Sequence, residues 1–295
     1  MKITLLGNCQ VESIRACLGI LLPSAQVSMH NSWNITNEFG SISKLKSYLQ
    51  EADVVIAHRF YGIPGIEFEE IASHSRFLEF PVLNFSSFHP DCIYLVDADK
   101  NKIVRSVIGD YNSSIIAFSY QNSVSIAQCL ASFREEIFKF VGYYDAWDSS
   151  VKSLDAEFAR CGFRAGDYLA RWMSKEPFVH SINHPKLFAI HDLVKDALQR
   201  LGIKYFQVNN ITDYVADPLL NYSGWPIYDQ IAEIYGYSGD FYFRGNYEHN
   251  ARYLHTLPEF VETSYNLYAE AGVQRFSNEL FDVWKQVGLL DRINS

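Results

Sequence analysis

The chain opens with a strand–turn–helix pattern that restricts it to an α/β fold. The apolar run Met1–Leu6 predicts a short buried strand, and Val11–Leu18 has the apolar spacing of an amphipathic helix. The four residues Gly7-Asn8-Cys9-Gln10 join the two. A tight turn at such a junction is where α/β proteins place a reactive atom, because backbone N–H groups at a helix N-terminus favour negative charge.

Cys9 is the reactive candidate of this turn. A thiol at a helix N-terminus is expected to have a lowered pKa and a larger thiolate fraction, which makes it a plausible nucleophile. The alternative is a small buried cysteine that packs under the turn, because free cysteine is usually a buried hydrophobic residue.

The first 120 residues alternate strand and helix signals. A helix is predicted over Ser43–Gln50, and strands over Ala52–Ala57 and Phe77–Leu83. Short apolar strands separated by helices imply a parallel sheet with helices on both faces. Three polar loops, at 7–10, 58–59 and 84–89, follow strand ends and are therefore expected at the carboxyl edge of that sheet, where ligands bind.

Helices dominate from Ser123 onward. They are expected over Ser125–Phe140, Ser149–Cys161, Gly166–Met173, Leu187–Leu201 and Pro258–Leu290. Phe178–Ile182 is predicted to be extended, Tyr205–Val208 to be a last strand, and residues 212–258 to be irregular and aromatic. With no repeat or linker, the chain is predicted to be a single domain, with a sheet core over about 1–210 and a largely helical elaboration over about 211–295.

Composition narrows the class of protein. A net charge of −9 without a Lys/Arg cluster argues against nucleic-acid binding. The five cysteines form no CxxC pair, which argues against a zinc site and a disulfide framework and for a reducing compartment. No leader pattern and no apolar run of about 18–20 residues is present, so a cytoplasmic protein without a transmembrane segment is expected. The 19 tyrosines suit sugar or nucleotide stacking, or an oligomer interface.

Motifs spread along the chain carry a family resemblance. They are Gly7-Asn8-Cys9-Gln10, Phe88-His89-Pro90-Asp91, Gly142-Tyr143-Tyr144-Asp145-Ala146-Trp147, Arg171-Trp172, Ser181-Ile182-Asn183-His184-Pro185-Lys186-Leu187, Trp225-Pro226-Ile227-Tyr228 and Gly239-Asp240-Phe241-Tyr242-Phe243. Together they resemble the capsular-polysaccharide-biosynthesis acetyltransferase family (WcbI type), a relative of the SGNH hydrolases. The likeness spans nearly the whole chain and implies an SGNH-hydrolase-like parallel sheet flanked by helices.

The resemblance also implies an activity. It is a transfer of an acetyl group from acetyl-coenzyme A to a hydroxyl of a surface polysaccharide or its precursor, without a metal. Cys9 would either carry the acyl group or bind substrate while a histidine activates the sugar. The alternatives are an SGNH-type esterase or deacetylase, and a non-catalytic carbohydrate- or nucleotide-binding domain of a glycan assembly system.

Two histidines compete for the role of base. His89 has Asp91 two residues on, which would either orient the imidazole as the third member of a triad does or cap the next turn. His184 stands where SGNH hydrolases place their late histidine, but Ser181 replaces the aspartate of their Asp-x-x-His pattern. His89 is preferred, because only it has a carboxylate in its own motif.

The remaining candidates are donors and cations. Asn8 and Gln10 are expected to donate hydrogen bonds near the reacting centre, where an oxyanion would need them. Gly7, Asn84 and Asn183 complete the expected oxyanion and substrate-binding set. The expected partners of the coenzyme phosphates are Arg15, Arg59, Arg171 and Lys186, with Arg59 preferred because it follows a strand directly.

Overall fold

The chain divides into two compact units, and each is assembled from three segments. The computed structural model describes residues 1–246 and 253–294. The first unit comprises Met1–Asn84, Ser153–Val179 and Asn183–Leu220, and the second Phe85–Lys152, His180–Ile182 and Asn221–Ser295. The single-domain organisation stays a prediction.

The first unit contains the predicted parallel sheet. Its strand order is β2-β1-β3-β4, and all three pairings are parallel. The strands are β1 (Lys2–Gly7), β2 (Gln26–Asn31), β3 (Val54–Ala57) and β4 (Phe77–Glu79). The register pairs Leu6 with Ala57 and Ala57 with Glu79, so the carboxyl ends of the three strands reach the same edge. The predicted fold class, a parallel sheet flanked by helices, is confirmed.

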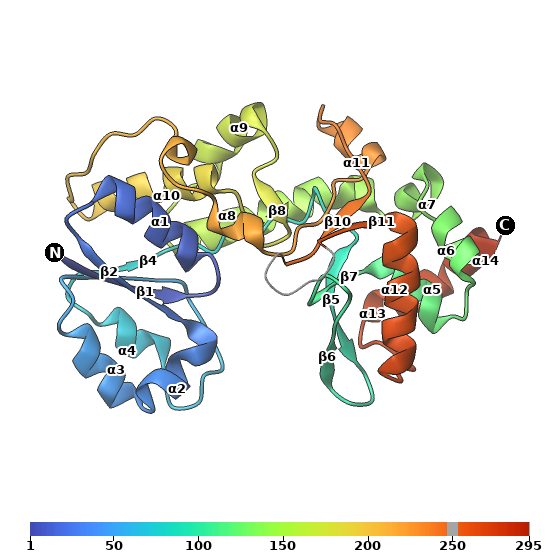
Figure 1. The fold of residues 1–295 in the computed structure, drawn as a ribbon, viewed down its shortest axis with the longest axis horizontal. Helices are drawn as coiled ribbons and strands as arrows, with labels where there is room; N and C mark the ends of the chain where they lie inside the picture. The colour runs from blue at the N-terminus through green and yellow to red at the C-terminus, as the bar shows by residue number, and fades with distance from the viewer. Residues whose placement is uncertain (247–252, 295) are drawn as a thin grey trace. The chain divides into compact units, whose positions relative to one another are not determined.

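Helices cover both faces of this sheet (Figure 1). One side carries α1 (Val11–Leu21) and α10 (Leu187–Arg200), which pack on each other. The other carries α2 (Ile35–Phe39), α3 (Ile42–Leu49) and α4 (Phe68–Ala72). The unit also contains α9 (Gly166–Lys175), β9 (His184–Pro185) and the 3-10 turn η3 (Ile211–Asp213). Three elements straddle the chain boundaries of the units: α8 (Ala146–Arg160), β8 (Val179–Ser181) and η4 (Pro218–Asn221).

The second unit has an antiparallel sheet and an aromatic core. Strands β5 (Cys92–Asp97), β6 (Lys102–Val104) and β7 (Tyr111–Ser113) pair in the order β6-β5-β7, and β10 (Tyr242–Arg244) pairs with β11 (Leu254–Thr256). The helices are α5 (Ser114–Gln121), α6 (Ile126–Ala131), α7 (Glu135–Phe140), α11 (Asp229–Ile234), α12 (Leu257–Glu270), α13 (Glu279–Gln286) and α14 (Leu289–Asn294), and η2 spans Tyr143–Asp145. Stacked rings, such as Phe243 on Phe260 at 4.0 Å between centroids, fill the core.

Several sequence-based boundaries were wrong for identifiable reasons. The helix expected over Ser125–Phe140 is broken into α6 and α7, and the Ser132 hydroxyl bonds to the Gln128 carbonyl at the end of α6. Such side-chain bonds compete with helix continuation. Tyr205–Val208 is not a strand; the backbone N–H of Phe206 bonds instead to the carbonyl of Leu21.

The strand expected over Phe77–Leu83 ends at Glu79. Its continuation leaves the ladder, because the Val82 N–H donates to the Glu157 carboxylate and the Leu83 N–H to the Gln10 side chain. The antiparallel sheet of the second unit was not predicted. Among the described residues, none of the helices combines the length and apolar character needed to cross a bilayer.

Candidate active site

The turn between β1 and α1 is built as the sequence predicts. Gly7 ends the strand and Val11 begins the helix. The backbone N–H of Val11 bonds to the Asn8 carbonyl at 3.1 Å, and the Asn8 side-chain oxygen accepts from the Gln10 N–H at 3.0 Å. This side-chain turn is a common use of asparagine, and no residue of the described chain accepts a hydrogen bond from the Asn8 NH₂ group.

Gln10 holds the turn in place. Its fully buried amide donates to the carbonyls of Leu83 at 3.0 Å and Asn183 at 2.9 Å, and accepts from the Leu83 N–H at 3.1 Å. Both amide hydrogens are therefore engaged with backbone. The expectation that Gln10 donates to an oxyanion was wrong: it is a positioning residue that joins the turn to two other segments of the first unit.

Only glycine fits at position 7, because the ring of His58 occupies the space that a side chain would need. No role for His58 was predicted from the sequence. A Cβ atom on Gly7 would lie 2.5 Å from Nδ1 of His58 and 2.9 Å from Cγ1 of Val11. His58 follows β3 directly, and its N–H bonds to the Leu6 carbonyl at 2.9 Å, so the sheet itself places the imidazole beside the turn. The signal was present in the sequence, since His58 directly precedes Arg59 at the strand end.

The imidazole of His58 is only 2% exposed, and neither ring nitrogen has a hydrogen-bond partner among the described residues. Burial lowers its pKa from 6.5 to about 3, so the ring is neutral at pH 7. A buried, unsatisfied polar group is costly, and a ligand or a catalytic role at the site is one physical explanation for it.

The Cys9 thiol is half-buried and protonated at neutral pH. Burial raises its pKa from 9.0 to about 11, and the negative charge of Glu12 adds to the rise. The backbone N–H groups of Cys9 and Gln10 oppose this effect without overcoming it. The predicted lowering of the pKa was therefore wrong, because desolvation raises the pKa by more than the backbone N–H groups of the helix N-terminus lower it. The thiol consequently needs a base to become a nucleophile.

One of the two candidate bases is connected to the turn within the first unit. His184, which is 7% exposed, follows Asn183, whose carbonyl accepts from the Gln10 amide. His184 begins the short strand β9, as expected for an extended residue before proline. Asn84, in the same unit, is exposed.

His89 and Asp91 belong to the second unit, and their predicted relationship was wrong. The buried ring of His89 has Nδ1 3.2 Å from the Pro226 carbonyl, so a backbone oxygen takes the place expected for Asp91. The fully buried Asp91 carboxylate accepts four other hydrogen bonds, from Ser114 Oγ, the Ile115 N–H, Tyr143 OH and Tyr228 OH, at 2.6–3.0 Å. It caps α5 and ties together the aromatic core, which was the alternative interpretation of its motif.

The four predicted phosphate-binding cations differ in availability. Arg59 bonds to Glu79 at 2.9 Å and Glu69 at 2.8 Å. Arg171 pairs with Asp192, and Lys186 with Glu176. Arg15 is exposed on α1 and forms no ion pair within the described chain. The preference for Arg59 stays a prediction, although two carboxylates already hold its guanidinium. Arg15 lies on the helix that starts at the turn and has no such partner among the described residues.

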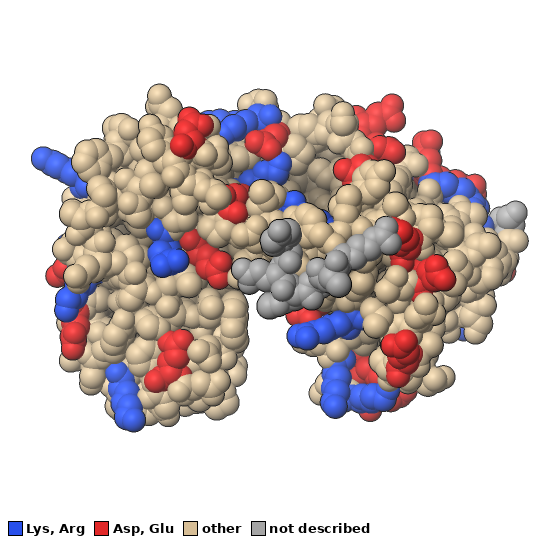
Figure 2. Space-filling model, in the orientation of Figure 1, with Lys and Arg blue, Asp and Glu red and all other residues tan. Residues whose placement is uncertain are grey.

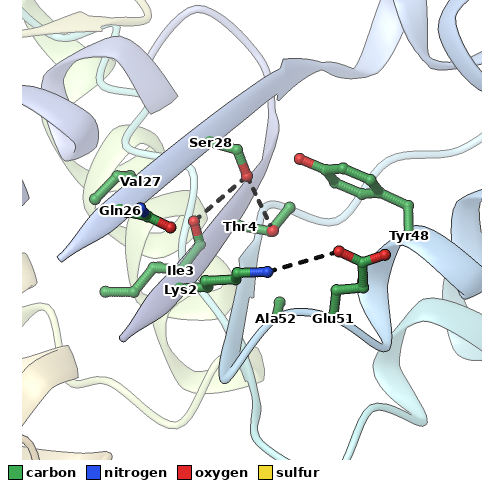
Figure 3. Close-up of a pocket in the computed structure, with 9 residues that line it drawn as sticks. All are labelled: Lys2, Ile3, Thr4, Gln26, Val27, Ser28, Tyr48, Glu51 and Ala52. Carbon is green, nitrogen blue, oxygen red and sulfur yellow. Dashed lines mark hydrogen bonds and ion pairs between the residues drawn. The ribbon is translucent and has the colours of Figure 1, made fainter.

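A separate cavity of about 290 Å³ lies at the opposite ends of β1 and β2 (Figure 3). Its hydroxyl groups bond to each other, Thr4 Oγ1 to Ser28 Oγ at 3.0 Å, and Lys2 pairs with Glu51 at 3.6 Å. Ligands of parallel sheets bind beyond the carboxyl ends of the strands. This cavity is at the amino ends, so the turn at Cys9 remains the candidate active site.

Comparisons with known proteins agree with the fold. One solved structure, described as native WcbI, a polysaccharide biosynthesis enzyme, without a disulfide bond between coenzyme A and a cysteine, superimposes with a TM-score of 0.71. The match covers 99% of this chain and 96% of that one at 14% identity, so it shows the fold alone. A comparison with curated proteins found no match. The family model "Polysaccharide biosynthesis enzyme WcbI" matches residues 2–205, more than half of the chain. The chain therefore belongs to the WcbI family of polysaccharide biosynthesis enzymes.

Proposed function

We propose that the protein is a coenzyme-A-dependent acetyltransferase that acetylates a sugar hydroxyl during the synthesis of a surface polysaccharide in the cytoplasm. The observation that carries the proposal is a cysteine at the β1–α1 turn of a chain from this family. The solved relative supports it, since its description relates coenzyme A to a cysteine. A thiol that meets the coenzyme at this position would suit acyl transfer.

In the proposed reaction the Cys9 thiol gives its proton to a base, and its sulfur forms a bond to the acetyl carbonyl carbon. The bond to the coenzyme sulfur breaks, and that sulfur takes up the proton and leaves as a thiol. A sugar hydroxyl then attacks the carbonyl carbon of the acetyl-cysteine and loses its proton to the base. The bond from that carbon to the Cys9 sulfur breaks, the sulfur takes up the proton from the base, and the sugar leaves as its acetate ester. The negative charge that develops on the carbonyl oxygen in both steps needs hydrogen-bond donors; the Cys9 backbone N–H and the Asn8 NH₂ are those we propose.

A base is indispensable in this scheme, because the Cys9 pKa of about 11 leaves almost no thiolate at pH 7. We propose a histidine for the role, with His184 tested first. Its neighbour Asn183 is bonded to the turn through Gln10, which supports a fixed relation to the nucleophile. His89 remains the second candidate, with the Pro226 carbonyl as the group that orients its ring.

The coenzyme carries several negative charges, and its proposed contacts start from Arg15. This cation is exposed and unengaged within the described residues, so it would bind a phosphate without giving up a partner. Arg59, Arg171 and Lys186 would each have to exchange a carboxylate for the coenzyme.

The test is incubation with acetyl-coenzyme A, followed by measurement of free coenzyme thiol with and without sugar acceptors. We expect stoichiometric release without acceptor, turnover with acceptor, and loss of at least about 10⁴-fold of turnover in Cys9→Ala. Cys161→Ala is the matched control, because Cys161 is the other cysteine that is not fully buried, and it should keep full activity.

Other outcomes would separate the alternatives. Turnover without a sugar acceptor would indicate a hydrolase. Cys9→Ala activity within a few-fold of wild type would remove the covalent step, and the absence of both coenzyme binding and release would leave a non-catalytic glycan-binding protein.

A further inference from the structure

A second cleft of the first unit lies between α9 and α10. Its volume is about 260 Å³, and Asn209 also lines it. Figure 2 shows blue basic side chains alternating with red acidic ones over α9. Of the described residues that line the cleft, three are cations, namely Arg171, Lys175 and Lys195, and one is an anion, Asp192.

The single carboxylate of the cleft is already satisfied. Asp192 accepts from Arg171 at 2.9 Å, from Lys195 at 3.0 Å and from the indole N–H of Trp172 at 3.1 Å. Lys175 pairs with no carboxylate of the described chain; its ammonium lies 4.4 Å from the centre of the Phe188 ring. The cleft thus has an excess of two positive charges in a protein whose net charge is −9.

The buried imidazole of His191 also belongs to this cleft. It lines the same cleft from α10, is 2% exposed, and its Nε2 atom has no hydrogen-bond partner among the described residues. Burial and the charge of Lys195 lower its pKa to about 4, so the imidazole is neutral at pH 7. A buried nitrogen without a partner beside surplus cations is the arrangement that an anionic oxygen ligand would complete.

We propose that this cleft binds a phosphate monoester, held by the ammonium groups of Lys175 and Lys195, by the Asn209 amide and by His191. Lysine binds phosphate as a point charge, and each amide or imidazole N–H satisfies one further oxygen. Clefts for drug-sized ligands measure about 300–1,000 Å³, so 260 Å³ suits a sugar phosphate or the phosphate end of a larger molecule. The proposal does not depend on the acetyltransferase activity.

Calorimetric titration of the full chain tests this inference, with Cys9→Ala as the background so that no turnover contributes heat. The probes are inorganic phosphate, glucose 1-phosphate and adenosine 3′,5′-bisphosphate, with glucose as the uncharged comparison. Lys175→Gln keeps most of the stem over Phe188 and removes the charge; Lys44→Gln, exposed on α3 of the same unit, removes the same charge elsewhere. Circular dichroism checks that both variants are folded, and Lys195→Gln provides a second variant of the cleft.

We expect the phosphate compounds to bind and glucose not to bind, with affinity at least tenfold weaker in Lys175→Gln and Lys195→Gln and unchanged in Lys44→Gln. Tighter binding of glucose 1-phosphate than of the bisphosphate would identify the ligand of the cleft as a sugar phosphate. Tighter binding of the bisphosphate would identify it as a nucleotide. Absence of binding at millimolar concentrations of all three probes, or equal weakening by Lys44→Gln, would overturn the proposal.

Discussion

The turn at Cys9 and the cluster around Asp91 both belong to motifs that carry the family resemblance, yet they are built in opposite ways. Asp91 is a fully buried carboxylate with four hydrogen-bond donors. Beside Gly7 of the turn, the buried imidazole of His58 has no partner among the described residues, and the Cys9 thiol has a raised pKa. The polar group at Asp91 has its hydrogen-bond partners within the protein, whereas the imidazole at the Cys9 turn has none among the described residues.

This difference separates the structural and functional uses of polar residues. A buried carboxylate with four donors contributes to the stability of the second unit, and its hydrogen bonds hold it in a structural role. An unsatisfied site costs stability, and that cost is tolerated where a ligand or a reaction needs the group. Stability should therefore be sensitive to Asp91 and less so to His58, and substitutions can test this contrast.

The largest effect is expected for Asp91→Ala. Four donors, two of them on the buried rings of Tyr143 and Tyr228, would lose their acceptor, so the free energy of unfolding should fall by about 3–5 kcal/mol in urea titrations. Asp110→Ala is the control in the same unit, because its ion pair with Arg105 is largely exposed and should contribute at most about 1 kcal/mol. Equal losses in the two variants would contradict the role of Asp91 as the centre of the cluster.

Gln10→Ala should cost somewhat less, about 2–3 kcal/mol, because it leaves the buried Leu83 backbone without its partner and frees the Asn183 carbonyl. Unfolding in urea measures the loss. Gln26→Ala, at an exposed residue of β2, should change stability by no more than about 0.5 kcal/mol. A neutral effect of Gln10→Ala would mean that the turn is positioned without this amide.

Gly7→Ala should destabilise by about 2 kcal/mol, because the new methyl group would overlap the His58 ring. A double-mutant cycle with His58→Ala tests the cause: removal of the ring makes room for the methyl group, so the two changes should be coupled by at least about 0.5 kcal/mol. Strict additivity would show that Val11, the other neighbour, causes the strain.

The pH dependence of stability should report on His58. Its folded pKa of about 3 is below the unfolded value of 6.5, so the unfolded state binds the proton first and stability falls as the pH decreases from about 6.5 toward 3. Between pH 7 and 5 this contribution amounts to about 1–2 kcal/mol. His58→Leu should remove it and flatten the acid limb of the stability profile. An unchanged limb would show that His58 is not neutral and buried in solution.

The smallest effect concerns the coenzyme. Thermal shifts in millimolar coenzyme A should decrease more in Arg15→Ala than in Arg59→Ala, because Arg15, unlike Arg59, has no carboxylate partner among the described residues. A fivefold loss of affinity corresponds to about 1 kcal/mol. A larger decrease in Arg59→Ala would show that its carboxylates release it on binding.

Sequence reasoning was reliable where local pattern determines structure and failed where distant contacts decide. The β1–turn–α1 junction and the parallel sheet follow from apolar periodicity within the segments themselves. The early end of β4 depends on Glu157 and Gln10, both more than 70 residues away. Other features also arise only when remote segments pack together. Examples are the bonds that Asp91 accepts from Tyr143 and Tyr228 and the desolvation of Cys9. No local sequence motif could predict them.

The interleaved construction of the first unit has a consequence for biosynthesis. Its sheet is complete by Glu79, but α10, which packs on α1, ends at Arg200, and the unit closes only at Leu220. A chain emerging from the ribosome at about 5–20 residues per second would expose the α1 face of the sheet until three-quarters of the protein has been made. A continuous fragment that contains this whole unit must reach Leu220 and therefore also includes Phe85–Lys152 of the second unit. Truncations that end before Leu220 should yield aggregation-prone chains rather than a smaller folded enzyme.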